Sequence, residues 1–583
     1  MNTQERDILI TLYEKGFSNQ RDLSHLTGHS LGVVNRSLHN LVDEGYLDDR
    51  FFASKKAKTE IESKSPKNAI ILAAGFGMRM VPINTQTPKG LIEVRGEPLI
   101  ERLIKQLHQK GILEIHIVVG FLKDQFEYLI DKYDVDLIVN EEYFCKNNLH
   151  SLYLASQFIS NTYIVPCDIW SKENPFSNHE LYSWYMVSDK LSENSYVRVN
   201  RKMELVSVSD SSLGNSMIGI SYVSKEAAGF LRSKLSQYDK DRQYSDSFWE
   251  ETLFTNGRMA VSAKVVDCNA TIEINTYEQL REFDSNSNHL KSDALKTISE
   301  VLNVDIVSIK GISVLKKGMT NRSFLFGVNN KKYIMRIPGE GTSKLIDRRK
   351  ESDVYATIKG KGICDDVVYI DSEKGYKITE YLEGSRVCDP GNVRDLETCM
   401  SLLRTFHGFH FKVDHEFDIF GQIDFYEALW NGKPSVYRDY KETKKKVFLL
   451  KNYIASFEIK KVLTHIDAVP DNFLFTSSGD VRLIDWEYAG MQDPHVDIAM
   501  FCIYSLYDRE DVDRLIDIYF EGDCQLETRI KIYSYISACG LLWSNWCEYK
   551  RSLGVEFGEY SLRQYRYAKD YYRIVEGLLN KNA

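Results

Sequence analysis

Four polar residues near position 470 have the types and spacing that phosphoryl transfer needs. His465, Asp467 and Asn472 form the pattern H-x-D-x-x-x-x-N. Asp485 follows thirteen residues after Asn472, at the end of the apolar run 481–484. Transfer of a phosphoryl group needs a carboxylate beside the acceptor hydroxyl and two further ligands for the Mg²⁺ bound to ATP. Asp467 suits the first task and Asn472 and Asp485 suit the second, while we expect His465 to be a structural residue beneath the loop.

A second group of residues, near position 75, is suited to holding a polyphosphate. Residues 72–79 read L-A-A-G-F-G-M-R. Gly75 and Gly77 let the backbone approach phosphate oxygens closely, and the N–H groups form an anion nest. Arg79, expected at the start of a helix, is able to hold phosphate oxygens in a fork, and Lys89 adds a mobile point charge. A lone G-x-G is most often a turn, so the prediction depends on the full run and the lysine.

Aromatic residues near the C-terminus suggest a pocket for a quaternary ammonium group. Trp543 and Trp546 are three residues apart, so they share one face of a helix. A quaternary ammonium donates no hydrogen bond and is held by aromatic faces and a nearby carboxylate. Glu487 and Tyr488, within the motif 485–488, would complete the pocket. Two tryptophans alone more often belong to a hydrophobic core, so the prediction depends on that motif.

The elements around the glycine-rich run predict a doubly wound α/β domain. Short apolar runs alternate with helical segments, as in a parallel sheet with right-handed crossovers. These runs cover residues 69–74, 115–119, 137–139 and 163–168. Ligands of such sheets bind at the carboxyl ends of the strands, where the glycine loop and Asp168 fall. We therefore expect Asp168 to be a functional acid and not a strand-end cap.

The chain is expected to be an α/β protein of three domains. We expect a winged helix at residues 1–58, a doubly wound, Rossmann-like domain at 66–285 and a protein-kinase-like fold at 292–583. Residues 53–67 are rich in Lys, Ser and Glu and look like a solvated linker. The polar run 284–288 marks the second boundary. In the last domain aromatic-rich helices follow three strands, which are expected at residues 306–315, 323–328 and 332–337.

The N-terminal domain gives a mixed signal for DNA binding. Short helices joined by tight turns predict a helix-turn-helix, and residues 45–47 would begin its wing. Residues 1–58 contain as many Lys and Arg as Asp and Glu, unlike a strong DNA binder. The third helix nevertheless has polar side chains that suit base readout, namely those of His29, Asn35, Arg36, His39 and Asn40. We expect the domain to bind DNA or a protein partner, or to form a dimer.

The composition limits the class of protein. The chain has 583 residues, of which 43% are hydrophobic and 27% charged, which are ordinary values for a globular protein of several domains. The net charge of −9 provides no overall basic field for nucleic acid or anionic lipid. The ten cysteines include no C-x-x-C pair, which favours reduced thiols. With no signal peptide and no long apolar run, we expect a cytoplasmic protein without membrane insertion.

Residues 68–285 resemble the family of sugar-nucleotide and phosphocholine nucleotidyltransferases. The resemblance rests on L-A-A-G-x-G-x-R at 72–79, P-K-G-L at 88–91 and the amphipathic helix that follows. It implies that Arg79 and Lys89 are catalytic, because they stabilise charge on the nucleotide phosphates. The implied CTP-binding residues are Leu72, Ala73, Ala74, Gly75, Gly77, Arg79, Lys89, Asn148 and Ser151.

The same resemblance implies Mg²⁺ as cofactor, bound by Asp168. The second metal-binding acid of the family usually stands in a Glu-Ile-Asp run, which here reads Glu273-Ile274-Asn275. Asn275 is able to ligate through its carbonyl oxygen but brings no charge. The metal site is therefore either weaker than usual or completed by another acid, such as Asp267 or Glu273.

Residues 300–580 resemble the choline and ethanolamine kinase family, which is related to the aminoglycoside phosphotransferases. The catalytic-loop pattern carries this resemblance, and residues 318–324 look like the loop that covers the phosphates. It implies that Asp467 is the catalytic base and that Asn472 and Asp485 hold Mg²⁺. The implied ATP-binding residues are Asn321, Arg336 and Glu351, the last two as an ion pair. The implied choline-binding residues are Glu487, Tyr488, Trp543 and Trp546.

The two resemblances describe consecutive reactions. The first is phosphorylation of choline by ATP, and the second is transfer of CMP from CTP to phosphocholine, which gives CDP-choline. Details at residues 147–152 and 167–170 look more like the phosphocholine enzymes than the sugar enzymes. The resemblance also implies that the product serves to decorate bacterial surface glycans with phosphocholine.

Two other interpretations are open at this point. In one, a sugar-1-phosphate nucleotidyltransferase is fused to an amino-sugar or other small-molecule kinase. In the other, the chain is a transcription regulator that senses choline or nucleotide. The complete sets of residues at 72–89 and 465–485 argue against the regulator, because a sensor needs no phosphoryl-transfer carboxylate. A homo-oligomer is compatible with either interpretation.

Overall fold

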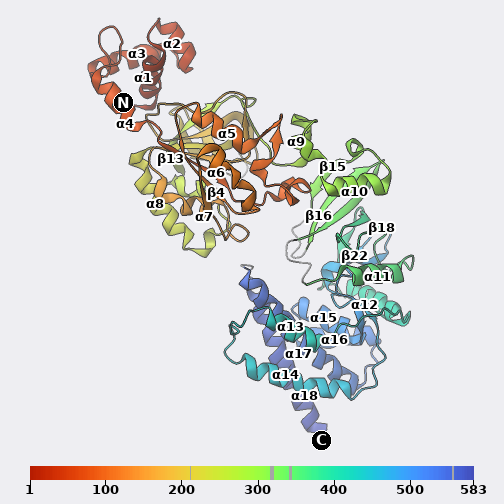
Figure 1. Cartoon of the computed structure of the whole chain (residues 1–583). Helices are drawn as coiled ribbons and strands as arrows, with labels where there is room; N and C mark the ends of the chain where they lie inside the picture. The colour runs from red at the N-terminus through yellow and green to blue at the C-terminus, as the bar shows by residue number, and fades with distance from the viewer. Residues whose placement is uncertain (210–211, 316–320, 340–344, 554–556, 583) are drawn as a thin grey trace. The chain divides into compact units, whose positions relative to one another are not determined.

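The chain forms two compact units, Met1–Ser292 and Asp293–Ala583 (Figure 1). The computed structural model describes residues 1–209, 212–315, 321–339, 345–553 and 557–582. Residues 318–320, which begin the predicted phosphate-covering loop, lie outside the described residues. Both the N-terminal domain and the Rossmann-like domain, called the nucleotide-binding domain below after its predicted ligand, belong to the first unit.

Three short helices form the core of the N-terminal domain. They are α1 (Thr3–Lys15), α2 (Gln20–Thr27) and α3 (Leu31–Asp43). Each helix begins after an Asn or Ser whose side chain accepts a backbone N–H of the first turn, which satisfies a donor that the helix itself leaves unpaired. A β-bridge between Leu47 and Ala53 closes the wing. The predicted winged helix-turn-helix is confirmed.

The predicted linker after this domain is wrong. Residues 55–64 form a further helix, α4 (Lys55–Lys64). Its Ala57 and Ile61 are fully buried in the core of the N-terminal domain. Two apolar residues spaced by four are enough to bury one stripe of a short helix. Because the other positions are Lys, Glu, Ser and Thr, the composition resembles that of a solvated linker.

A ten-stranded mixed sheet forms the centre of the nucleotide-binding domain. The four predicted strands are confirmed, and neighbours among them pair in parallel. They are β1 (Asn68–Ala73), β4 (Glu114–Val119), β5 (Asp136–Val139) and β6 (Thr162–Pro166). The sheet order is β5-β4-β1-β6-β11-β8-β13-β10-β9, with β12 paired to β13. Its second half contains antiparallel pairs, so the doubly wound arrangement applies to the first half alone.

The remaining strands of this sheet come later in the chain. They are β8 (Trp184–Ser192), β9 (Val197–Val199), β10 (Glu204–Ser207), β11 (Gly214–Val223), β12 (Phe254–Thr255) and β13 (Arg258–Val266). β11 joins the two halves, because it pairs antiparallel with β6 on one side and with β8 on the other.

Helices cover both faces of the first half of the sheet. Ala69 and Ile71 of β1 belong to one buried cluster, and the intervening Ile70 and Leu72 belong to another. A continuous apolar run is what a strand buried on two faces requires. The covering helices are α5 (Leu99–His108) and α6 (Tyr128–Tyr133) on one face and α7 (Asn148–Leu154) and α8 (Lys225–Asp239) on the other. Ligands therefore have access to the strands at their carboxyl ends.

The second unit begins with a helix and a five-stranded antiparallel sheet. Helix α10 (Asp293–Leu302) precedes the sheet, whose order is β15-β16-β17-β19-β18. The first predicted strand starts later than expected, because residues Ile306–Ser308 form a 3₁₀ turn. The strands are β15 (Lys310–Val314), β16 (Asn321–Val328), β17 (Lys331–Pro338), β18 (Val367–Ile370) and β19 (Lys377–Glu380), and helix α11 (Arg348–Ile358) connects β17 to β18.

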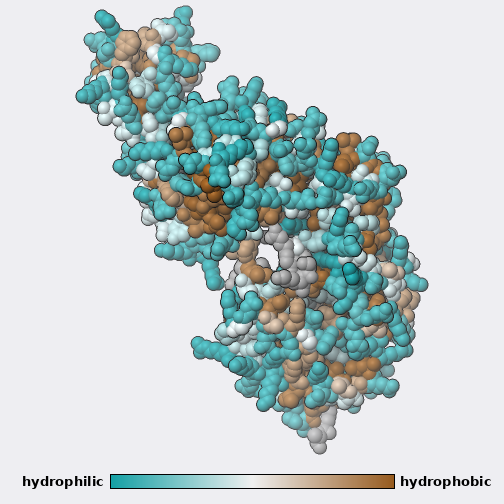
Figure 2. All heavy atoms as spheres, viewed as in Figure 1, coloured by the Kyte–Doolittle hydropathy of each residue, from teal (hydrophilic) through white to brown (hydrophobic). Residues whose placement is uncertain are grey.

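Helices dominate the rest of this unit. Buried residues recur all along α17 (Leu526–Ser552), which contacts four other helices. These are α13 (Ile419–Ala428), α14 (Tyr440–Ala455), α15 (His495–Tyr504) and α18 (Glu559–Asn582), and α12 (Val393–Gly408) packs on α16 (Arg509–Phe520). Hydrophilic side chains predominate on the visible face of the molecule (Figure 2). Across the described residues, none of the helices has the length and apolar character needed to cross a membrane.

Candidate active sites

The glycine-rich loop follows β1 directly. Gly77 has a φ of +66° and begins a single 3₁₀ turn at Met78–Met80, so the prediction that Arg79 starts an α-helix is wrong. A proline at position 82 explains the early end, since the residue before a proline disfavours the helical conformation. A Cβ on Gly77 would lie 3.3 Å from Cδ of Lys89, so the glycine also makes room for the lysine.

Four predicted residues of the first unit meet at the end of the sheet. The Lys89 ammonium donates to Oδ2 of Asp168 and, at 2.7 Å, to Oδ1 of Asn275. The Arg79 guanidinium donates to the same Asn275 oxygen at 3.4 Å. The short strands β7 (Ile169–Ser171) and β14 (Thr271–Glu273) pair with each other and bring residues 168 and 275 together.

The donor set at this point fits Mg²⁺. Oδ1 of Asp168 is buried and has no hydrogen-bond partner, and carboxylate and amide oxygens are ligands that Mg²⁺ accepts. Asp267 lies in an exposed turn, where its Oδ1 accepts the N–H of Asn269 at 2.8 Å. Burial raises the pKa of Glu273, and the charge of Asp168 raises it further, so Glu273 faces the site. Of the two alternative acids, Glu273 is therefore the better placed.

Protein ligands alone do not complete a metal site in either unit. Within the described ranges, no group of three or more His, Cys, Asp and Glu side chains is arranged to hold a metal ion. Mg²⁺ is usually bound by one or two carboxylates together with substrate phosphates and water. The arrangement around Asp168 agrees with that pattern.

The two predicted base-reading residues have structural partners. The Asn148 Oδ1 accepts the backbone N–H of Trp249 at 2.8 Å, and the buried Ser151 hydroxyl accepts from Nδ2 of Asn140 at 3.0 Å. Both residues thus fix the start of α7 against its neighbours. Their contact with a base stays a prediction.

A buried carboxyl group close to this site was not predicted. Glu250, in the 3₁₀ segment Trp249–Leu253, accepts the Tyr185 hydroxyl at 2.9 Å through Oε1, while its Oε2 is buried without a partner. Burial raises the pKa of Glu250 to about 7, and the charges of Glu251 and Glu273 add to the shift. Tyr196 lies nearby, since Glu250 helps to raise its pKa beyond the effect of burial. A carboxyl group among aromatic rings suits an organic cation.

In the second unit, the expected ion pair between β17 and α11 is present. Arg336 donates to both carboxylate oxygens of Glu351, at 2.8 Å through Nη2. Burial would raise the pKa of Glu351, but Arg336 overrides it and holds that pKa at about 2. A planar fork of this kind fixes the guanidinium in one orientation. The pair therefore keeps both groups ionised and holds the guanidinium of Arg336 in one orientation.

Asp497 of α15 fixes the backbone of the predicted catalytic loop. Its two carboxylate oxygens accept the backbone N–H of His465 at 3.0 Å and of Ile466 at 2.7 Å. Ile466 has a φ of +70°, a strained conformation for a branched residue that this clamp maintains. Burial lowers the pKa of His465 to about 4, and its Nε2 bonds the Ile484 carbonyl at 3.0 Å. His465 is thus neutral and structural, as expected.

The three residues predicted for phosphoryl transfer lie close together next to this loop: Asp467, Asn472 and Asp485. Nδ2 of Asn472 donates to the Asp467 backbone oxygen at 2.9 Å and to its carboxylate at 3.2 Å, which leaves the amide oxygen as a ligand atom. Burial raises the pKa of Asp467 to about 8, and the charges of Asp485 and Glu487 contribute. Burial likewise raises the pKa of Asp485. Crowded, buried oxygens of this kind fit a divalent cation.

Three of the predicted head-group residues form an aromatic wall. The ring of Tyr488 lies 5.8 Å from that of Trp543, which lies 5.5 Å from that of Trp546, each pair edge-on. Phe557 continues the wall, 5.2 Å from Trp546. Tyr560 lies beside Phe557, with their ring centroids 6.5 Å apart.

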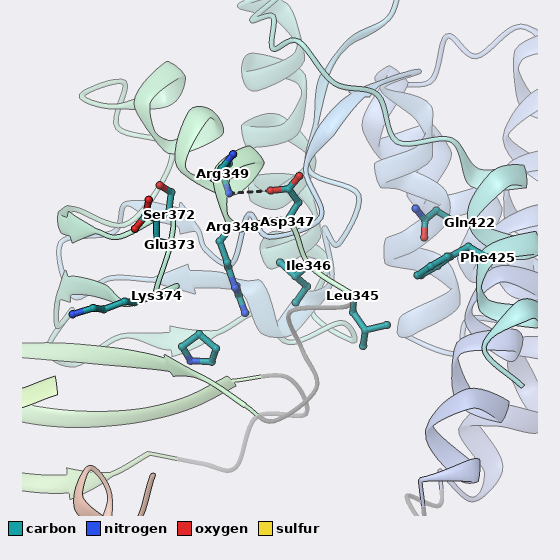
Figure 3. A pocket seen from close by; sticks show the side chains of 11 residues that line it. Leu345, Ile346, Asp347, Arg348, Arg349, Ser372, Glu373, Lys374, Gln422 and Phe425 are labelled. Carbon is teal, nitrogen blue, oxygen red and sulfur yellow. Dashed lines mark hydrogen bonds between the residues drawn. The ribbon is translucent and has the colours of Figure 1, made fainter. Parts of the chain in front are cut away.

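Glu487, expected to contact choline, and Asn321, expected to contact ATP, are hydrogen-bonded to each other. Oε2 of Glu487 accepts from Nδ2 of Asn321 at 2.8 Å and from Arg348 at 3.0 Å. The Asn321 amide oxygen accepts a second Arg348 N–H at 2.8 Å. The two residues thus belong to one buried polar cluster with Arg348. Their separate roles toward choline and ATP stay predictions. A pocket of about 520 Å³ opens beside Arg348, between Lys374 and the side chains of Gln422 and Phe425 (Figure 3).

Comparison with known families agrees with this geometry. The chain matches family models for a winged helix-turn-helix DNA-binding domain at residues 1–48, a MobA-like NTP transferase domain at 69–175 and the phosphotransferase enzyme family at 311–533. The choline-phosphate cytidylyltransferase of Streptococcus pneumoniae is 34% identical over 228 residues, which are 38% of this chain and 99% of that protein. The chain belongs to the cytidylyltransferase family.

Other relatives extend the comparison. The 2-aminoethylphosphonate cytidylyltransferase of Lancefieldella rimae is 33% identical over 233 residues, which are 37% of this chain and 92% of that protein. Protein LicA of Haemophilus influenzae is 28% identical over 261 residues, which are 42% of this chain and 96% of LicA. This cytidylyltransferase therefore carries a phosphotransferase domain on the same chain.

Several residues that build these candidate sites lacked a sequence signal. Glu250 is one of two adjacent acids in a short 3₁₀ segment, and Tyr185 lies in the buried first half of a strand, where aromatic residues are common. Arg348 is one of two adjacent arginines, and nothing in its neighbours distinguishes it from Arg349. Asp497 has a helical position that any N-terminal helix acid would share. Each becomes recognisable through its long-range contacts alone.

Proposed function

We propose that the chain is a bifunctional enzyme, which phosphorylates choline with ATP and then transfers CMP from CTP to phosphocholine. The observation that carries the proposal is that each unit combines the predicted phosphoryl-transfer residues with a group of aromatic side chains suited to an organic cation. In the second unit this site is the aromatic wall around Trp543 and Trp546. In the first unit it is Glu250 with Tyr185 and Tyr196. The relatives named for choline-phosphate and the kinase-like relative support the assignment.

In the kinase reaction, Asp467 takes the proton of the choline hydroxyl. Burial and the neighbouring Asp485 raise the pKa of this carboxyl, which makes Asp467 a stronger base than an exposed aspartate. The aromatic wall holds the trimethylammonium group by its charge and its methyl surface. Arg336, fixed by Glu351, holds the ATP phosphates in place.

In the cytidylyl transfer, the phosphate of phosphocholine attacks the α-phosphorus of CTP and pyrophosphate leaves. Lys89 and Arg79 hold the phosphate oxygens and stabilise their charge, and the loop 75–77 supplies backbone N–H groups. Asn148 and Ser151 are proposed to contact the base from the start of α7. Glu250 provides the negative charge that holds the ammonium group.

Both reactions are proposed to use Mg²⁺. Asp168 and Asn275 would hold it in the first unit, and Asn472 and Asp485 in the second. When bound, the ion neutralises charge on phosphate oxygens and orients them. We place both reactions in the cytoplasm, and CDP-choline would then supply a separate transferase that decorates surface glycans.

The N-terminal domain is proposed to bind DNA or a protein through α3. Asn35, Arg36 and His39 are exposed on this helix, in agreement with the prediction. Asn40, which is also exposed, donates to Glu5 at 2.9 Å, and the half-buried His29 bonds Asp7 at 3.0 Å. These two side chains are thus partly engaged within the domain.

A coupled assay by mass spectrometry tests the proposal. Purified full-length protein is incubated with Mg²⁺, ATP, CTP and choline, and each component is omitted in turn. We expect phosphocholine with ATP alone and CDP-choline once CTP is added. If sugar 1-phosphates replace phosphocholine as acceptors, the sugar nucleotidyltransferase interpretation holds. If no substrate turns over, the regulator interpretation gains support.

A further inference from the structure

A lysine lies on the same helical stripe as the two tryptophans of the aromatic wall. Trp543, Trp546 and Lys550 follow one another at spacings of three and four along α17, so they share one face of the helix. Only 8% of Lys550 is exposed. Its ammonium lies over the ring of Trp546, 5.5 Å from the centroid. The aromatic wall therefore already holds a cation that belongs to the chain.

This ammonium has the chemistry of the substrate that the wall is proposed to bind. A cation within about 6 Å of an indole face is attracted by the quadrupole of the ring. Two cations at one ring repel each other, and the repulsion is stronger away from bulk water. Burial lowers the pKa of Lys550, while the charge of Glu487 opposes this effect. A bound choline and the ammonium of Lys550 thus compete for the same electrostatic environment.

We propose that Lys550 competes with the substrate cation for the aromatic wall, because its ammonium must leave the face of Trp546 before a substrate ammonium binds there. This inference rests on the proposed function of the kinase unit. In the free enzyme the ammonium of Lys550 occupies the face of Trp546. Substrate binds to the minor state in which the side chain of Lys550 has moved away.

The size of the effect follows from the contact that is lost. A partly desolvated cation–π contact makes the open state a minor one, so the affinity for any competing ammonium falls by the open fraction, about five- to thirty-fold. The factor is the same for choline and for ethanolamine, because it depends on the protein alone. A residue that contacted the bound substrate would instead change the ratio of the two affinities.

The test uses the full-length chain and the variants Lys550→Met and Lys550→Arg. Binding of tetramethylammonium, choline and ethanolamine is measured by calorimetry without nucleotide, and KM and kcat for choline are measured with ATP. We expect Lys550→Met to bind all three cations about five- to thirty-fold more tightly and to lower KM, with kcat unchanged. Lys550→Arg keeps the charge and should bind no more tightly than the wild type. Lys550→Gln replaces the Met variant if that variant does not fold.

A double variant locates the effect at the ring. In a Trp546→Leu background, the change Lys550→Met should give no gain, because the contested face is absent. Unchanged or weaker cation binding by Lys550→Met overturns the inference, as does a changed ratio of choline to ethanolamine affinity. The outcome is distinguishable from failure of the proposed function. If the wild type binds cations but phosphorylates no choline, the function fails while the competition is still measured.

Discussion

The protonation of Glu250 should control the affinity of the transferase unit for phosphocholine. This carboxyl group is 8% exposed and has a pKa of about 7, because burial disfavours its charged form. Below that pKa it is neutral and offers no charge to an ammonium group. Above it, the carboxylate attracts the trimethylammonium head. The KM for phosphocholine is therefore expected to fall as the pH rises through 7.

The expected change in KM follows from the pKa of Glu250 and from the direction in which the group titrates. With a pKa of about 7 the carboxylate fraction rises from about one tenth at pH 6 to about nine tenths at pH 8. If only the carboxylate form binds the head group, the KM falls about tenfold over this interval. The variant Glu250→Gln has no carboxylate at any pH, so its KM should be high throughout.

The assay is release of pyrophosphate at saturating CTP, measured every half unit between pH 6 and 8. The phosphate group of the substrate itself titrates in this range, and Glu250→Gln reports that contribution alone. The ratio of the two KM values at each pH isolates the effect of Glu250. The exposed neighbour Glu251, changed to Gln, keeps the carboxyl group of Glu250, so the KM should still fall as the pH rises, with a midpoint at slightly lower pH because the charge of Glu251 adds to the raised pKa. A ratio that does not change with pH, or that moves the other way, refutes the reasoning.

Four further changes test other parts of the molecule. Asn275→Asp adds a carboxylate beside Asp168 and should tighten Mn²⁺ binding at least about tenfold by calorimetry; an unchanged affinity would place the metal elsewhere. Arg336→Lys loses the two-pronged contact and should lower kcat/KM of the kinase about ten- to a hundredfold, with cytidylyl transfer from supplied phosphocholine intact as the internal control. Asp467→Asn should abolish choline phosphorylation with the same internal control, and residual turnover near the wild-type rate would exclude it as the base. Ile61→Ala should lower the free energy of unfolding by about 2–4 kcal/mol in a urea titration of the first unit's transition; no loss would mean that α4 contributes nothing to the core.

The positions of the parallel strands and of the catalytic loop could be predicted because their patterns are local. An apolar run such as 69–74 fits a strand buried on both faces and little else. The spacing of Asp467, Asn472 and Asp485 is fixed by one loop and one strand, so it is visible in the sequence. The pair of Arg336 with Glu351 needed only the order of a strand and the following helix.

Other features depend on contacts that no local pattern encodes. Helix α4 buries two residues, Ala57 and Ile61, and its composition is otherwise that of a linker. Glu250 becomes unusual only because β8 brings Tyr185 against it. Glu487 was assigned to the choline pocket from its place in the motif 485–488. Its ion pair with Arg348 of α11 could not be predicted from that motif.

The two units are proposed to bind the same ammonium group, one before and one after a phosphate group is added to the molecule. Choline carries one positive charge, and in the kinase unit it meets a base, Asp467, whose raised pKa reflects burial and the nearby Asp485 and Glu487. Phosphorylation adds a group with about two negative charges, which those carboxylates repel. In the transferase unit, Lys89 and Arg79 attract that phosphate group, while Glu250 keeps an attraction for the unchanged ammonium. In the proposed mechanism, the charge that the first reaction creates therefore favours release of phosphocholine from the kinase site and its binding at the transferase site.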